Sequence, residues 1–435
     1  MSRRIVALPL LILAWFAGPA PAADLDADPI RYASAPADNA ISRLIGRLES
    51  GQATLARDDD HGYLRSVLRE LAVPESSQVL VFSKTSLQRH RIGPKTPRAV
   101  YFNDDVYVGF CLRGDVIELS AADPQLGTAF YTLDQHADTE RRITRQTESC
   151  LICHGSSQNQ GFPGHLVRSV FADRQGEPIL SAGSYRTDDT SPLRERWGGW
   201  YVTGTCGKQV HLGNLIVPAK GRVEAEENTS GVNVTDLSDR FTVGLYATPH
   251  SDIVALMTLE HQTEGHNRLA RANLLTRVAL HEEADLNKAL GRPADYRSES
   301  TASRIRNAGE PLVKYLLFSG EAKLTDKVEG TSGFAREFAA RGPFDHRGRS
   351  LREFDLEHRL FKYPCSYLIY SRSFDTLPGP VHDYVLRRLF DVLSGKDTSA
   401  AFAHLSAADR RAILGILRDT KPGLPDYWCA STDGH

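Results

Sequence analysis

The feature that most constrains the fold is a change in hydrophobic pattern about halfway along the chain. Before residue 203, short runs of β-branched and aromatic residues alternate with turn residues, as in Arg98–Phe102 and Val106–Phe110. Such runs predict β-hairpins. After Pro249 the apolar residues follow a helical spacing, and the stretch from Ile253 to about Leu290 contains no proline. The sequence therefore predicts an α+β fold, with a β-hairpin-rich N-terminal half and a mainly helical C-terminal half.

Local signals predict the boundaries of several elements. Apolar residues at helical spacing predict helices between residue 23 and Pro74. The polar residues 134–149 predict a short helix, residues 150–165 a loop, and residues 179–182 a strand. In the C-terminal half the predicted helix starts are Ser251 or Asp252, Pro380 and Ser406.

The first 22 residues resemble an export signal. Arg3 and Arg4 precede an apolar stretch from Ile5 to about Ala17, and Ala20-Pro21-Ala22 is a small-x-small cleavage sequence. An uncleaved membrane anchor is the alternative, but an apolar run of about 13 residues is too short to cross a bilayer comfortably. We therefore expect residues 1–22 to be a signal peptide and the protein to be periplasmic or otherwise exported.

Composition limits the partners of the processed chain. Without residues 1–22 it carries 50 basic and 54 acidic residues, so no positive excess is present to neutralise nucleic-acid phosphates. It contains no uninterrupted apolar stretch of membrane-spanning length, and we expect it to be soluble after cleavage. The change in pattern predicts two parts, a β-rich region over residues 23–248 and a helical domain over residues 249–435.

One short motif indicates the chemistry. Cys150-Leu151-Ile152-Cys153-His154 is a C-x-x-C-H sequence, which in an exported chain is a signature for attachment of haem c. The spacing of Cys150 and Cys153 must match the two vinyl groups of one haem, and His154 then lies beneath the iron as the proximal ligand. A zinc site would require a second ligand pair, and the sequence has no other C-x-x-C. The sequence therefore predicts one covalent haem c, attached between the two halves of the fold.

Through Cys150, Cys153 and His154 the chain resembles the c-type cytochromes. The segments Glu195–Thr205 and Tyr363–Ser371 also resemble large exported monohaem proteins of bacteria, a likeness that implies no mechanism. The resemblance implies a haem iron that exchanges electrons with a redox partner protein. The chain departs from small cytochromes c because its motif lies far from the N-terminus and no methionine occurs in the next hundred residues.

The sixth iron ligand is left open by the sequence. Met257 is the one methionine besides Met1, and a thioether ligand raises the haem potential relative to histidine. His261 lies four residues later on the same helix face and is the alternative distal ligand. The competing interpretation is that Met257 is a core side chain and that His261 lies on a polar helix face. The loop histidines His165 and His211 are further possible ligands, His250 and His266 lie beside or on the same helix, and an iron without a sixth ligand is also compatible with the sequence.

The other cysteines allow several interpretations. In an oxidising compartment Cys111, Cys206, Cys365 and Cys429 can form two disulfides, with three possible pairings that the sequence does not distinguish. Cys365 lies in an apolar run and also fits a buried thiol.

Three functions are compatible with a single haem. The first is electron transfer through a six-coordinate iron. The second is a haem enzyme or small-ligand sensor with an open or displaceable sixth iron site, and the third is a structural haem. About 413 residues around one haem exceed what a simple shuttle needs, which indicates a docking surface or a substrate pocket. No catalytic acid–base set is evident, and the helix carrying His261 and His266 with Glu260 and Glu264 is the best candidate region. We expect electron transfer, with the enzyme or sensor as the alternative.

Overall fold

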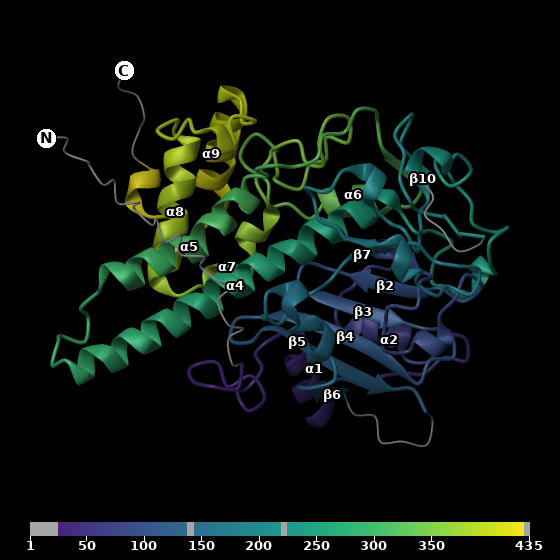
Figure 1. The fold of residues 1–435 in the computed structure, drawn as a ribbon, viewed down its shortest axis with the longest axis horizontal. Helices are drawn as coiled ribbons and strands as arrows, with labels where there is room; N and C mark the ends of the chain where they lie inside the picture. Colours follow the sequence, from purple (N-terminus) through teal and green to yellow (C-terminus); the bar gives the residue numbers. More distant parts are fainter. Residues whose placement is uncertain (1–24, 137–142, 219–223, 430–435) are drawn as a thin grey trace, which may run out of the picture.

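The computed structural model describes residues 25–136, 143–218 and 224–429 (Figure 1). The predicted signal peptide, residues 1–22, lies outside the described residues. Within them the chain forms an antiparallel sheet of seven strands from the N-terminal half and a mainly helical C-terminal half. The predicted α+β fold class is confirmed.

The sheet is a meander with one added strand. Its spatial order is β6-β5-β4-β3-β2-β1-β9, and every neighbouring pair is antiparallel. Consecutive strands β2 and β3 are neighbours because a short turn joins them. In this turn the Asn103 side chain accepts hydrogen bonds from the backbone N–H groups of Asp105 and Val106. The strands are β1 (Val79–Val81), β2 (Arg98–Phe102), β3 (Val106–Phe110), β4 (Val116–Asp123), β5 (Gly127–Asp134), β6 (Ile143–Gln146) and β9 (Trp200–Tyr201).

Both faces of the sheet are covered by helices. Along β2, Ala99 and Tyr101 belong to one hydrophobic cluster, whereas Val100 and Phe102 belong to another. This alternation follows from the period of two in a strand. The first cluster includes residues of α1 (Ala40–Glu49) and α2 (Leu64–Glu70), and the second includes residues of the long helix α4 (Ile253–Ala289). The sheet is therefore the middle layer of this part of the protein.

Helix α4 connects the sheet to the C-terminal half. Asp252 caps its start, accepting hydrogen bonds from the N–H groups of Val254 and Ala255. Figure 1 shows α4 running along the sheet with the later helices on its other side. These are α5 (Glu299–Leu316), α6 (Phe334–Ala339), α7 (Arg372–Asp375), α8 (Gly379–Leu393) and α9 (Ala407–Thr420). Ser406 forms a capping box with Asp409 at the start of α9, as the sequence predicts.

Two small antiparallel strand pairs and several 3-10 turns complete the structure. Strands β7 (Arg168–Val170) and β8 (Ser184–Arg186) pair with each other, as do β10 (Gly204–Thr205) and β11 (Glu329–Gly330). The 3-10 turns are Glu75–Ser77, Arg89–Arg91, Ser157–Asn159, Leu180–Ala182, Leu193–Glu195, Ala225–Glu227, Val243–Leu245, Tyr367–Tyr370, Ala400–Phe402 and Asp426–Trp428. No helix in the described ranges is both long enough and apolar enough to cross a membrane.

Three local predictions differ from the structure. Residues 143–146 form the edge strand β6 and not a helix, because they pair with β5 in the register Thr132–Thr144. Residues 180–182 form a 3-10 turn, and the strand follows at β8. Residues 151–154, predicted as loop, form the one-turn helix α3 (Leu151–His154). In each case the segment is too short for local pattern to determine its conformation.

Candidate functional site

The C-x-x-C-H segment begins a few residues after the edge strand β6 and ends with α3. Cys150 immediately precedes the helix and Cys153 lies three residues later, so the two side chains emerge from the same side of one turn. Cys150 is half-buried, Cys153 is exposed, and both are free thiols. Burial raises the pKa of the Cys150 thiol. The structure therefore presents two neighbouring thiols at the surface, as attachment of one group through both would require.

His154 is held by the loop that follows it. Its Nδ1 lies 2.8 Å from the carbonyl oxygen of Gly164, and since a carbonyl only accepts, Nδ1 carries the proton. The His154 carbonyl accepts hydrogen bonds from Gly164 N (3.1 Å) and Asn159 Nδ2 (3.0 Å). Burial lowers the pKa of His154, which favours the neutral ring. The lone pair is therefore on Nε2, which makes no hydrogen bond to any residue that the structure describes.

Helix α4 fixes the position of this loop. Asn267 Oδ1 accepts a hydrogen bond from His165 N at 2.8 Å, and Asn267 Nδ2 donates to the His165 carbonyl at 2.9 Å. A Cβ atom at Gly164 would lie 2.2 Å from Asn267 Oδ1, so the loop approaches the helix as closely as only glycine allows. Asn267 and Gly164 together therefore hold the carbonyl group that orients His154.

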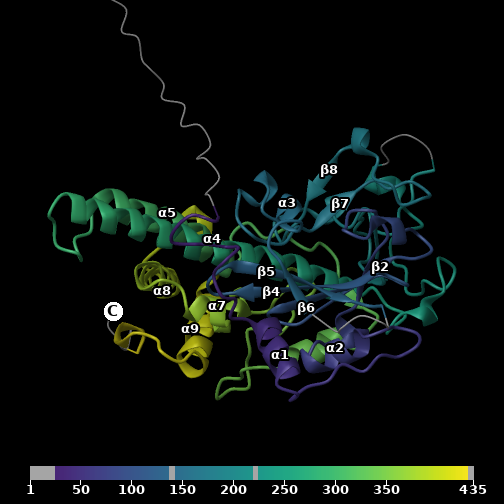
Figure 2. The ribbon, with the colours of Figure 1, turned by 90° about the horizontal axis from the view of Figure 1, so that it is seen from below.

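The surroundings of the motif fit an apolar cofactor. Ile152, between the two cysteines, is 78% exposed, and Leu180 is 80% exposed. Leu180 precedes β8, whose Arg186 donates a hydrogen bond to the carbonyl oxygen of Gln158 in the loop after the motif. Figure 2 shows α3 near β7 and β8, away from α1 and α2. The residues present thus fit haem: two thiols, a histidine nitrogen with a free lone pair, and the exposed apolar side chain of Ile152 between the thiols.

Two further histidines lie close to His154. The ring centroids of His154 and His165 are 6.5 Å apart, and those of His165 and His266 are 6.4 Å apart. His165 Nε2 lies 2.9 Å from Ser120 Oγ, and His266 Nδ1 lies 2.9 Å from the Tyr107 hydroxyl. Burial lowers the pKa of both, to about 4 for His266. Among the described residues, no group of three or more histidine, cysteine, aspartate or glutamate side chains is arranged to hold a metal ion.

The sequence indicated His165 only as one histidine among several, and His266 only as part of a candidate acid–base region on the helix of His261. His165 ends the same loop as His154, and this proximity in the chain is the one signal that could have selected it. His266 reaches the same region only because α4 packs on the sheet, where its side chain meets Tyr107 of β3. No local pattern in the sequence marks that contact.

The packing of α4 does not favour the two predicted distal ligands. His261 is stacked between Tyr315 and Phe318, with ring centroids 4.7 and 4.5 Å away, on the side of the C-terminal helices. Met257 lies one turn earlier on the same face and is 3% exposed in the hydrophobic core. It precedes Asn267, which contacts the loop, by about 15 Å along the helix axis. Met257 and His261 as iron ligands therefore stay predictions without support from this geometry.

His261 also takes part in an arrangement that resembles a hydrolase triad. Its Nε2 lies 2.9 Å from Ser366 Oγ, and its Nδ1 lies 4.0 Å from Asp189 Oδ2. The second distance is too long for a hydrogen bond. Tyr315 OH also lies 2.8 Å from His261 Nε2, and Ser366 and His261 are both fully buried. A substrate cannot reach a fully buried Ser366 hydroxyl, so we interpret this cluster as part of the core.

The remaining cysteines are unpaired in the structure. Cys111, Cys206 and Cys365 are buried, Cys429 is exposed, and all four are free thiols. Burial raises the pKa of Cys365 to about 12, in agreement with its interpretation as a buried thiol. The two disulfides that the sequence allows are not formed here.

Comparison with models of known protein families, with curated proteins and with solved structures found no match.

Proposed function

We propose that the protein is an exported c-type haem protein that transfers electrons. One haem is attached through Cys150 and Cys153, with His154 as the proximal iron ligand. The observation that carries this proposal is the hydrogen bond from His154 Nδ1 to the Gly164 carbonyl. It places the lone pair on Nε2, directs that nitrogen away from the loop, and increases its basicity as a ligand.

The chain's own residues account for attachment and orientation. The S–H groups of Cys150 and Cys153 would each add across the C=C bond of one vinyl group. Each addition forms one carbon–sulfur bond, places the thiol hydrogen on the other vinyl carbon and consumes no oxidant. Asn159 and Gly164 fix the backbone of His154, while Phe130, with its ring centroid 4.7 Å from that of His154, shields the ring from water. Bound haem supplies a one-electron redox centre at this position.

Exposure of the motif favours electron transfer to another protein. Cys153 and Ile152 are exposed, so a group attached through these thiols would be accessible from the surface. A redox partner protein can approach that group directly. No nucleic acid is expected as a partner, because the processed chain has a slight acidic excess.

A haem enzyme or small-ligand sensor with an open sixth iron site is the second candidate. The observation in its favour is that His261 packs against Tyr315 and Phe318, and that Met257 shares that face of α4. Neither predicted distal ligand is therefore directed at the loop of His154. An open site would bind carbon monoxide in the reduced state.

The test is to express the full chain in a bacterial periplasm with the haem attachment machinery. Mass spectrometry should show the processed chain plus one haem, and absorption spectra of the reduced protein with and without carbon monoxide should report the sixth ligand. His154→Ala should keep the haem attached and change the iron spin state. Cys429→Ala serves as the control, because it removes an exposed cysteine outside the motif. A bare chain with two alkylatable thiols at Cys150 and Cys153 would disprove the proposal.

A further inference from the structure

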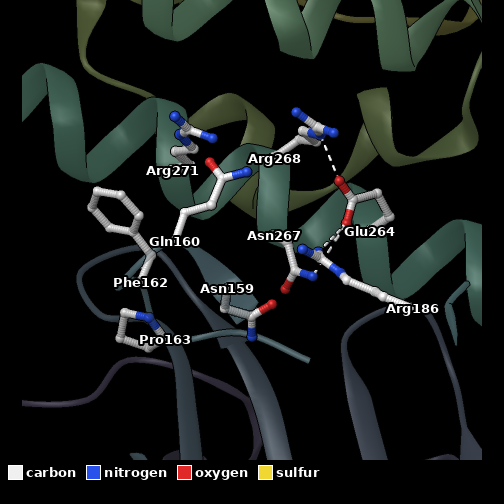
Figure 3. Close-up of a pocket in the computed structure, with 9 residues that line it drawn as sticks. All are labelled: Asn159, Gln160, Phe162, Pro163, Arg186, Glu264, Asn267, Arg268 and Arg271. Carbon is white, nitrogen blue, oxygen red and sulfur yellow. Dashed lines mark hydrogen bonds and ion pairs between the residues drawn. The ribbon is translucent and has the colours of Figure 1, made fainter. Parts of the chain in front are cut away.

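A narrow cleft lies beside the loop that holds His154. The loop residues Asn159, Gln160 and Phe162 form one wall, and α4 forms the other with Arg268 and Arg271 (Figure 3). Its enclosed part is small, and the cleft is partly open to solvent. Because Asn159 also donates to the carbonyl oxygen of His154, the cleft adjoins the proposed haem site directly.

The charges lining the cleft do not balance. Arg186 from β8 and Arg268 both pair with Glu264, at 2.7 and 2.6 Å respectively. Arg271 lines the same cleft and has no carboxylate partner within the described ranges 25–136, 143–218 and 224–429. Three guanidinium groups therefore face one carboxylate. Partial burial and the nearby Arg268 lower the pKa of Arg271, and the more distant Glu264 offsets only part of this effect.

A second observation indicates that the cleft accommodates a ligand or water. Asn159 is 7% exposed, and its Oδ1 atom is buried without a hydrogen-bond partner among the described residues. Figure 3 shows the Asn159 side chain between the loop and α4, among the residues that line the cleft. A buried carbonyl oxygen without a donor costs about 1–3 kcal/mol. A carboxylate cannot donate to this oxygen, so a water molecule bound beside it in the cleft would supply the missing donor.

We propose that this cleft binds a carboxylate or similar oxyanion, with Arg271 as the main cationic partner and Arg268 beside it. The carboxylate has two possible sources. It is either a propionate of the haem attached to Cys150 and Cys153, in which case the inference rests on the proposed function, or a small free carboxylate. Guanidinium groups suit both sources because their N–H donors match the two oxygen atoms of a carboxylate.

The experiment compares Arg271→Gln with Lys288→Gln in the full-length haem protein. Both substitutions remove one positive charge from α4, but Lys288 lies about 26 Å further along the helix and is exposed. The bound haem is first counted by mass spectrometry. The reduction potential is then measured against pH, and the melting temperature is measured with succinate replacing chloride at constant ionic strength.

The two sources give different results. If a propionate fills the cleft, Arg271→Gln lowers the reduction potential and adds a pH-dependent step to it, whereas Lys288→Gln does neither. If a free carboxylate binds, succinate raises the melting temperature of the parent and of Lys288→Gln but not of Arg271→Gln. Identical behaviour of the two variants in both measurements would overturn the inference. A parent chain without haem would instead refute the proposed function, and the succinate measurement would still test the cleft.

Discussion

Replacing Asn267 with alanine should loosen the loop that positions His154 while leaving α4 helical. Besides a long contact of 3.4 Å from Asn267 Nδ2 to Glu264 Oε2, the substitution removes the two shorter hydrogen bonds that Asn267 makes with the backbone of His165, at 2.8 and 2.9 Å. Each neutral hydrogen bond of this kind contributes about 1 kcal/mol to stability, so their loss costs about 2 kcal/mol. Alanine also favours helix more than asparagine does, by about 0.5 kcal/mol, which offsets part of this loss.

Asn273→Ala is a matched control on the same helix. Asn273 makes one hydrogen bond, from its Nδ2 to the carbonyl oxygen of Pro124 at 2.9 Å, and does not contact the loop of His154. The gain in helix preference is the same in both variants and cancels in the comparison. Urea unfolding followed by circular dichroism should therefore show Asn267→Ala to be less stable than Asn273→Ala by about 1 kcal/mol.

The reduction potential separates a role at the haem site from general packing. When the loop loosens, the Gly164 carbonyl withdraws from His154 Nδ1 and the histidine becomes a weaker donor to iron. A less basic ligand stabilises the oxidised iron less, so the potential of Asn267→Ala should rise while that of Asn273→Ala stays at the parent value. Equal potentials in the two variants would refute the reasoning, even if both lose stability as expected.

Three other results are expected. Cys150→Ala and Cys153→Ala should each retain no more than one thioether bond, and the double variant should lose covalent haem, as mass spectrometry would show. Met257→Leu should leave the reduction potential and carbon monoxide binding unchanged, because Met257 shares the α4 face of His261; a lower potential together with carbon monoxide binding would identify Met257 as the distal ligand. Burial lowers the pKa of His211 to about 3, so the free energy of unfolding should decrease as the pH falls below about 6.5, and less steeply in His211→Asn; equal slopes would contradict this assignment.

Elements with strong local signals could be predicted from the sequence. The runs at Arg98–Phe102 and Val106–Phe110 form β2 and β3 because β-branched and aromatic residues suit a buried sheet and Asn103 stabilises the turn between them. The starts of α4 and α9 follow from Asp252 and Ser406, whose side chains accept hydrogen bonds from the first helical N–H groups. These interactions act between residues close in sequence, which is why pattern alone identifies them.

Elements that depend on a distant partner could not be predicted. Ile143–Gln146 is short and polar, and it becomes strand β6 only because β5 offers a free edge. The single turn of α3 has the same origin, since a helix of four residues is not stable by itself. At its end, the His154 carbonyl accepts hydrogen bonds from Asn159 and Gly164 of the loop that Asn267 holds against α4.

The same distinction explains which part of the candidate site the sequence reveals. Covalent attachment requires a fixed spacing of Cys150, Cys153 and His154, so this part is readable from five consecutive residues. Gly164 and Asn267, which hold His154, are not at a fixed distance from the motif in the sequence. His261 and Asn267 are six residues apart on α4 and differ in direction by about 120°, so one meets the C-terminal helices and the other the loop. The angle between these two side chains around α4 follows from the sequence, but which side of α4 packs on the loop and which on the C-terminal helices does not. The prediction of Met257 and His261 as distal ligands required that second piece of information.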